Sequence, residues 1–154
     1  MPDGAEYGAP DQIDPQSLAD YLDVMSHAVF QSGMSWRVVN AKWPSIREAF
    51  DGFDPQAVAA FGEREIDELV QDTRVIRNRR KLLAISNNAA RLLEIDADHG
   101  SFRNYLRSHG DFEATVKDLK EQFSFLGDTG SYYFLHVVGE PVPPHEEWEA
   151  ARRR

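Results

Sequence analysis

Apolar residues recur at intervals of three and four along most of the chain, which is the spacing that places them on one face of an α-helix. The first such segment begins at about Pro15 and ends near Gly33, because glycine favours the end of a helix. Its inward positions are Leu18, Tyr21, Leu22, Met25 and Val29. No segment shows the strict alternation of a half-buried strand, so the sequence predicts an all-helical (all-α) fold.

Turn and capping residues divide the rest of the chain into further predicted helices. Asp54 and Pro55 form a start signal, an N-cap followed by proline at the first helical position. Pro44 is expected to kink or restart the helix that begins at Trp36. The predicted helices after the first cover residues 36–50, 55–61, 63–72, 73–97, 101–106, 112–123, 131–138 and 145–152. We expect one helical domain over residues 15–154, preceded by a flexible tail over residues 1–14.

A glycine-bounded turn, Leu126–Gly130, separates two of these helices. Backbone N–H groups left uncovered there, together with the positive N-terminal end of the following helix, can hold a DNA phosphate without reading the base sequence. Gly127, Thr129 and Gly130 are therefore candidate DNA-backbone-binding residues. The alternative is an ordinary helix–helix turn in which glycine supplies a positive φ angle.

Trp36 follows small and polar residues at a predicted helix junction, in the run Gln31-Ser32-Gly33-Met34-Ser35-Trp36. An indole exposed there presents a flat face on which a base, and a cationic base in particular, can stack. The alternative is that Trp36, like Trp43, belongs to the hydrophobic core.

Charge is distributed unevenly along the chain. The formal net charge is −9, which argues against a simple nucleic-acid coat protein. Basic residues nevertheless cluster in residues 74–81, where Arg77, Asn78, Arg79 and Lys81 lead into the longest predicted helix. Such a segment can contact DNA phosphates, although it is also typical of a solvated helix start.

Composition limits the remaining possibilities. The chain has no cysteine, which excludes a disulfide framework and a thiolate metal site. No apolar run is long enough to cross a bilayer, and residues 1–15 lack the apolar segment of a signal peptide. We therefore expect a cytoplasmic protein without a membrane partner.

Taken in order along the chain, these motifs resemble the DNA-3-methyladenine glycosylase I family of helix-hairpin-helix DNA glycosylases. The resemblance covers about residues 22–93 and 123–145. Besides the run from Gln31 to Trp36, it rests on the segments Phe50–Pro55, Val70–Asp72, Ile76–Arg79 with Lys81, Asn87–Ala89, Phe123–Gly130 and Tyr132–Gly139.

This resemblance implies a helix-hairpin-helix DNA glycosylase-like helical domain and an enzyme of base-excision repair. Such enzymes flip an alkylated purine such as 3-methyladenine out of double-stranded DNA and hydrolyse its N-glycosidic bond. We expect a monomer that uses no cofactor. The residues expected in the base-binding pocket are Ala28, Gln31, Ser35, Trp36 and Tyr132.

The chain departs from the family pattern where the family places a glutamate against the purine. Counted back from Trp36, that position is Ala28, and the cysteines of the family's zinc clasp are missing, so no metal is expected. A 3-alkylated adenine is already cationic and leaves easily, so stacking and exclusion of water can suffice. Alternatively Glu140, His145 or Glu147 supplies the catalytic group, unless Glu147 only caps the last helix.

Two rival functions stay open from the sequence. The alanine at position 28 favours a DNA-binding module that has lost catalysis, which would bind abasic-site DNA tightly without releasing a base. The net charge of −9 favours an interaction domain that no longer contacts DNA, which would show a flat binding isotherm even at low salt.

Overall fold

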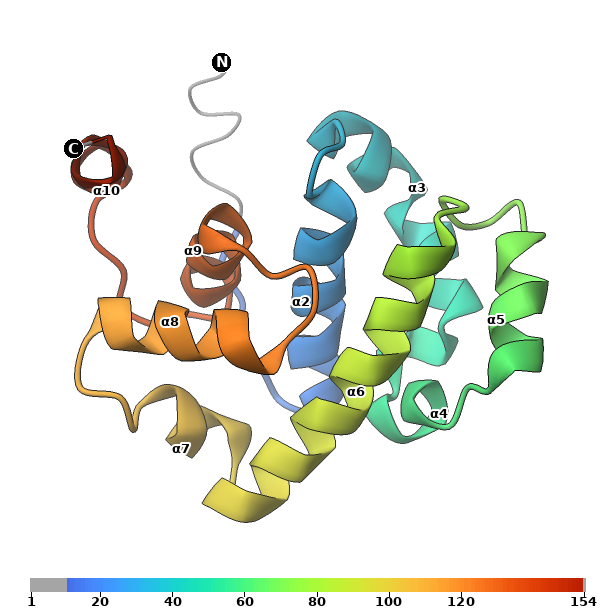
Figure 1. The fold of residues 1–154 in the computed structure, drawn as a ribbon, viewed down its shortest axis with the longest axis horizontal. Coiled ribbons are helices and arrows are strands. Elements are labelled where there is room, and N and C mark those ends of the chain that lie inside the picture. The colour runs from blue at the N-terminus through green and yellow to red at the C-terminus, as the bar shows by residue number, and fades with distance from the viewer. Residues whose placement is uncertain (1–10, 154) are drawn as a thin grey trace.

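The computed structural model describes residues 11–153 and shows helices gathered around one helix that is buried along most of its length (Figure 1). This helix, α2 (Leu18–Gln31), lies between α9 (Asp128–Val137) and α6 (Arg79–His99). Its buried positions run almost without a break from Tyr21 to Phe30, because neighbouring helices cover it on several sides. The described residues contain no strand, so the all-helical prediction is confirmed.

The other helices lie on the two sides of α2. On the side of α6 are α3 (Trp36–Ala49), α4 (Pro55–Ala59) and α5 (Glu63–Val70), with a 3-10 turn η1 at Asp51–Phe53. On the side of α9 are α7 (Phe102–Leu106), α8 (Phe112–Gln122) and α10 (His145–Arg152). None of these described helices is both long and apolar enough to cross a bilayer.

The predicted tail, residues 1–14, lies mostly outside the described residues. Its last part packs on the protein: the Ile13 backbone N–H donates to the Val137 carbonyl over 2.8 Å, and the Gln12 side chain donates to the carbonyl of His136. These two bonds fasten residues 12 and 13 to the C-terminal end of α9.

Local interactions decide two features of the predicted helices, the course of the chain at Pro44 and the start of the longest helix. Pro44 lies inside α3 and does not restart the helix. The carbonyl that loses its partner belongs to Asn40, which is exposed, so water can satisfy it. Helix α6 begins at Arg79, not at residue 73, because the side chain of Asn78 caps it by accepting from the backbone N–H of Lys81 over 3.2 Å.

A third difference concerns the glycine-bounded turn. Helix α9 begins at Asp128, so Thr129 and Gly130 belong to its first turn and only Gly127 precedes it. Neither glycine has a positive φ; the residue that does is Phe125, at 59°. Gly130 serves close packing instead, because a Cβ atom there would lie only 3.3 Å from Cδ1 of Leu126, and 3.6 Å from the Cβ of Ala28 on α2.

Candidate functional site

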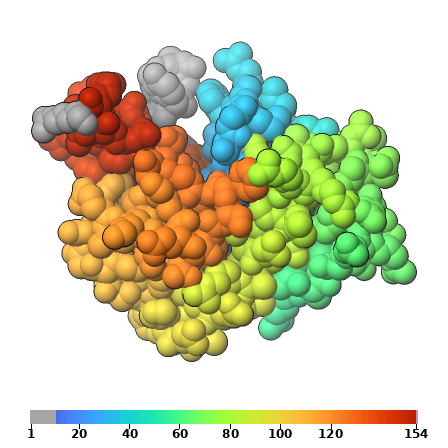
Figure 2. Space-filling view, viewed as in Figure 1, coloured from blue at the N-terminus to red at the C-terminus, as the bar shows by residue number. Residues whose placement is uncertain are grey.

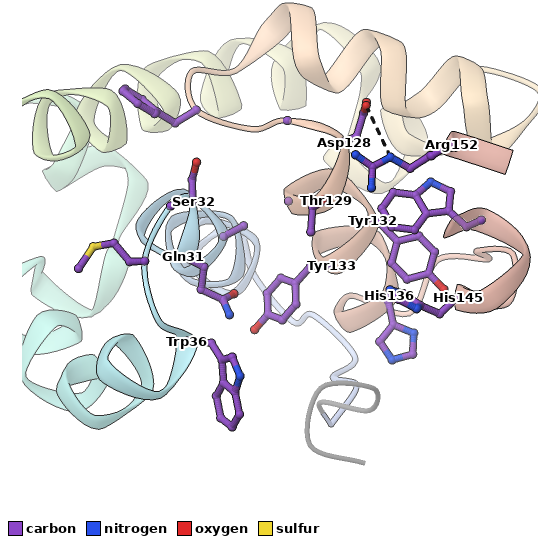
Figure 3. A pocket seen from close by; sticks show the side chains of 17 residues that line it. Gln31, Ser32, Trp36, Asp128, Thr129, Tyr132, Tyr133, His136, His145 and Arg152 are labelled. Atoms are coloured by element: carbon purple, nitrogen blue, oxygen red, sulfur yellow. Dashed lines mark ion pairs between the residues drawn. The ribbon is translucent and has the colours of Figure 1, made fainter. Parts of the chain in front are cut away.

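A cavity of about 620 Å³ opens between the end of α2, the start of α3, the start of α9 and α10 (Figure 3). Its volume lies within the range of small-molecule sites in proteins, roughly 300–1,000 Å³. Figure 2 shows the loop before α9 lying beside the starts of α3 and α6 on the viewed face. Segments about 100 residues apart in the sequence, such as Trp36 and Tyr133, therefore form a common wall.

Trp36 faces this cavity and keeps 37% of its surface exposed (Figure 3). Gly33, with a φ of 76°, turns the chain from α2 into α3, and Trp36 is the first residue of α3. Trp43, by contrast, is buried: only 6% of its surface is exposed, and its indole N–H donates to the carboxylate of Asp23 over 2.8 Å. The structure therefore gives Trp36 an open face and Trp43 a place in the core.

The inner wall next to Trp36 consists of Gln31 and Tyr133, with the buried ring of His27 behind them. The imidazole of His27 stacks on Tyr133 at a centroid distance of 5.5 Å. Burial raises the pKa of the Tyr133 phenol to about 12, with a smaller contribution from the charge of Asp23. Tyr133 thus presents a neutral hydroxyl group to the cavity at pH 7 (Figure 3).

The amino end of α9 forms the rim of the cavity. Gly127, Thr129 and Gly130 all line it, and the backbone N–H groups at the start of a helix have no partner within that helix. The carboxylate of Asp128 would repel a phosphate there, but it pairs with Lys120 at 2.8 Å and lies 4.0 Å from Arg152. Arg152 also pairs with Glu149 at 3.1 Å, so these two cations and two carboxylates balance, and the backbone N–H groups at the start of α9 supply the positive end of the rim.

Helix α10 supplies the outer wall of the cavity through Trp148 and Arg152, which were not among the residues predicted from the sequence. Trp148 packs on Tyr132 at 4.5 Å, and the guanidinium of Arg152 lies 4.6 Å from the centre of the Trp148 ring. His145 also lines the cavity and meets Tyr132 edge-on at 5.5 Å. Trp148 and Arg152 are four residues apart on a predicted helix, and that spacing was the available signal that they share a face.

The residues expected to carry catalysis are not brought together. Glu140 is 6% exposed and pairs with Arg107 at 3.0 Å, beside a separate cavity of about 260 Å³. Glu147 is exposed in the first turn of α10, where its charge favours the helix end, and it does not line the large cavity. Only His145 borders that cavity. Within residues 11–153 no group of three His, Asp or Glu side chains could hold a metal ion.

The expected pocket residues mostly meet at the cavity. Ala28, Gln31, Trp36 and Tyr132 line it, and the Tyr132 hydroxyl donates to the Pro143 carbonyl over 2.6 Å. Ser35 does not line it; it is the exposed N-cap of α3.

The basic segment requires a correction. Lys81, expected on a phosphate, is 5% exposed, and its ammonium donates to the carbonyls of Phe30 (3.2 Å) and Ser32 at the end of α2. Asn78 caps α6, and Arg79 pairs with Asp67.

Two other arginines of this segment are exposed, and one of them lies beside the cavity. Arg77 is exposed. Arg80, which was not among the expected contacts, lies 5.6 Å from the ring of Phe125 on the cavity wall. Within α6 the exposed cation beside the cavity wall is therefore Arg80, whereas Lys81 is buried.

Comparisons with known proteins agree on one family. The family model described as methyladenine glycosylase matches residues 4–122. The DNA-3-methyladenine glycosylase of Haemophilus influenzae is 30% identical, with 87% of this chain and 82% of that protein covered. The DNA-3-methyladenine glycosylase 1 of Escherichia coli K12 is also 30% identical, with 87% and 81% covered. The structure of 3-methyladenine DNA glycosylase I from Staphylococcus aureus has a TM-score of 0.76 at 26% identity, with 90% of this chain and 87% of that chain covered.

Proposed function

The chain belongs to the methyladenine glycosylase family, and we propose that its large cavity binds an alkylated adenine flipped out of double-stranded DNA. It is a DNA glycosylase of base-excision repair, which hydrolyses the N-glycosidic bond between the base and deoxyribose. The observation that carries the proposal is that Trp36 and the amino end of α9 open onto the same cavity.

The extruded base is held by stacking on Trp36, whose exposed face borders the space between α2 and α9. A purine alkylated at N3 is cationic, and a cation is attracted to the face of an indole. Gln31 and the neutral hydroxyl of Tyr133 lie next to Trp36 and can form hydrogen bonds with the edge of the base (Figure 3).

The backbone of the DNA is held at the rim. The uncovered N–H groups of Asp128, Thr129 and Gly130 donate hydrogen bonds to a phosphate at the positive end of α9. Lys120 pairs with the Asp128 carboxylate and so reduces its repulsion of that phosphate. The positive end of α9 thus lets a chain with a net charge of −9 hold a phosphate locally.

The chemistry needs little acid assistance. When the N-glycosidic bond breaks, its electron pair goes to N9 of the cationic base, which leaves neutral, while water adds to C1′ and loses a proton. Asp128 is the one carboxylate on the cavity wall among the described residues, and it is engaged with Lys120. The protein therefore contributes stacking, orientation and exclusion of bulk water.

This mechanism predicts that only cationic bases are released. Purified protein incubated with methylated duplex DNA should release free 3-methyladenine above the level of a heat-inactivated control. A duplex that carries hypoxanthine, a neutral purine, should lose none, because that base must be protonated to leave and the one carboxyl group among the described lining residues, Asp128, is held in an ion pair with Lys120. Chromatography of the released bases measures both.

The position of Ala28 favours a second candidate, a DNA-binding module without catalysis. Tight binding to abasic-site DNA together with no release of 3-methyladenine would establish this candidate and overturn the catalytic proposal. Release of hypoxanthine would contradict the mechanism, since it would require protonation of the base by a lining histidine, His136 or His145, to which the mechanism gives no role.

Arg80 is expected to contact a phosphate next to the cavity, because it lies over Phe125 on the cavity wall. Arg80→Ala should weaken binding to all duplexes alike and reduce the slope of log K against log salt by about 1. Fluorescence anisotropy at several salt concentrations measures this slope. Arg64→Ala on the distant helix α5, an exposed position, is the matched control and should leave the slope unchanged; equal slopes for the two variants would exclude the contact.

A further inference from the structure

Arg37 is an exposed arginine that lies against the indole on which the extruded base is proposed to stack. Its guanidinium carbon lies 5.9 Å from the centre of the Trp36 ring, within the range of a cation–π contact. Trp36 lines the large cavity, whereas Arg37 does not. The guanidinium therefore lies beside the cavity, next to its aromatic wall, with N–H groups that solvent or a ligand can reach.

This guanidinium has no carboxylate partner within residues 11–153. Other arginines of the chain do have one: Arg47 pairs with Asp23 at 2.6 Å, and Arg91 pairs with Glu94 at 2.9 Å. The chain has 26 acidic residues against 17 lysines and arginines, so carboxylates are not scarce. Arg37 is thus available for an anion from outside the protein.

The extruded base cannot be the partner of Arg37. An adenine alkylated at N3 is a cation, and two like charges next to one indole repel each other. The nucleotide that carries this base also brings two phosphates, one on each side of its sugar. A phosphate accepts two parallel N–H bonds from a guanidinium and removes the repulsion of the base.

We propose that Arg37 is a positioning residue that binds a phosphate flanking the extruded nucleotide, on the Trp36 side of the cavity. This inference rests on the proposed function of the cavity. The other flanking phosphate lies at the amino end of α9, whose Thr129 is on a different wall from Trp36 (Figure 3). Two phosphates held by two separate helices keep the sugar between them at the mouth of the cavity.

The position of Arg37 also predicts when it contacts DNA. Arg80, over Phe125, is expected to meet the backbone of any duplex. The phosphate proposed for Arg37 reaches Trp36 only when its nucleotide has left the base stack. Arg37 should therefore strengthen binding to DNA with an extruded nucleotide and contribute little to binding of intact DNA.

The first experiment measures binding to abasic-site and undamaged duplexes by fluorescence anisotropy at several salt concentrations. An abasic nucleotide has no base to unstack, so it turns out of the duplex at little cost. Arg37→Ala should weaken binding to the abasic-site duplex about tenfold and reduce its salt slope by about 1. Binding to the undamaged duplex should stay within about twofold of the wild type. Arg64→Ala, at an exposed position on α5, is the control and should change neither.

Two further measurements separate phosphate binding from support of the indole. Free 3-methyladenine carries no phosphate, so calorimetric titration should show that Arg37→Ala binds it at least as tightly as the wild type. Arg37→Lys keeps the charge without the planar pair of donors, so it should keep the wild-type salt slope and lose part of the affinity for the abasic-site duplex. Weaker binding of the free base by Arg37→Ala, with unchanged binding of the abasic-site duplex, would show that Arg37 only supports Trp36 and would overturn the inference.

The outcomes distinguish this inference from the proposed function. If the wild type releases 3-methyladenine but Arg37→Ala binds abasic-site DNA as the wild type does, the glycosylase is supported and the inference is overturned. Equal weakening on both duplexes also overturns it, because Arg37 would then be a general backbone contact. If the wild type releases no base and the tenfold difference on abasic-site DNA is still seen, the catalytic function fails and the inference is supported. A wild-type protein that binds neither duplex overturns both.

Discussion

Replacing Trp36 with alanine is expected to weaken binding of free 3-methyladenine by roughly 5- to 150-fold, since base–aromatic stacking contributes about 1–3 kcal/mol. The release of the base from methylated DNA should fall by a similar factor at subsaturating substrate. Stability should hardly change, because 37% of the side chain is already exposed. We expect the melting temperature to shift by less than about 3 °C.

Two other positions make this prediction specific. Val38→Ala, two residues further along α3 and 49% exposed, should change neither affinity nor stability. Trp43→Ala removes a buried indole that donates to Asp23 and should destabilise the protein by about 3–5 kcal/mol. If Trp36→Ala lowered the melting temperature strongly and left the affinity for 3-methyladenine unchanged, Trp36 would be a core residue and the proposed function would be contradicted.

Lys81→Met is expected to destabilise the protein more than Arg80→Ala, Arg64→Ala or Lys117→Met does. The ammonium caps the carbonyls of Phe30 and Ser32 at the end of α2, and methionine has a similar length without donors. Removing the donor from the carbonyl of buried Phe30 and from that of exposed Ser32 costs roughly 3 kcal/mol, which lowers the melting temperature of a chain of this size by roughly 6–12 °C. Thermal unfolding followed by circular dichroism measures the shift.

This substitution should also affect binding, because Ser32 lines the cavity and precedes the turn to Trp36. Lys117→Met, on the exposed face of α8, is the matched control and should stay within about 0.5 kcal/mol of the wild type. If Lys81→Met left stability unchanged but reduced the salt dependence of DNA binding, Lys81 would be a phosphate contact, as its sequence context indicated.

Two neighbouring basic residues have different environments, which a cluster of charges in the sequence does not predict. Lys81 and Arg80 are adjacent in the sequence, yet the first is buried on carbonyls of α2 and the second lies over Phe125 beside the cavity. Successive positions on a helix point about 100° apart. The composition of the segment therefore cannot tell which of its side chains meets solvent until the partner helix is placed.

The sequence determined the helical fold, most helix ends and the family. Apolar spacing, the Asp54–Pro55 start signal and Gly33 act within a few residues, so their physical effect can be worked out locally. The run from Gln31 to Trp36 indicated an aromatic face, and the structure places Trp36 at the cavity.

Only the tertiary structure decided which side chains share that cavity and which do not. Packing of α9 against α2, and of Trp148 on α10 against Tyr132 on α9, brings Tyr133, Trp148 and Arg152 to the cavity that Trp36 also lines, while Glu140 pairs with Arg107 elsewhere. The pairing of His27 with Gln31 and the capping by Lys81 likewise depend on contacts of buried polar groups. A polar group needs such a contact when other helices cover it and remove its water, and the order of residues alone does not reveal which groups are covered.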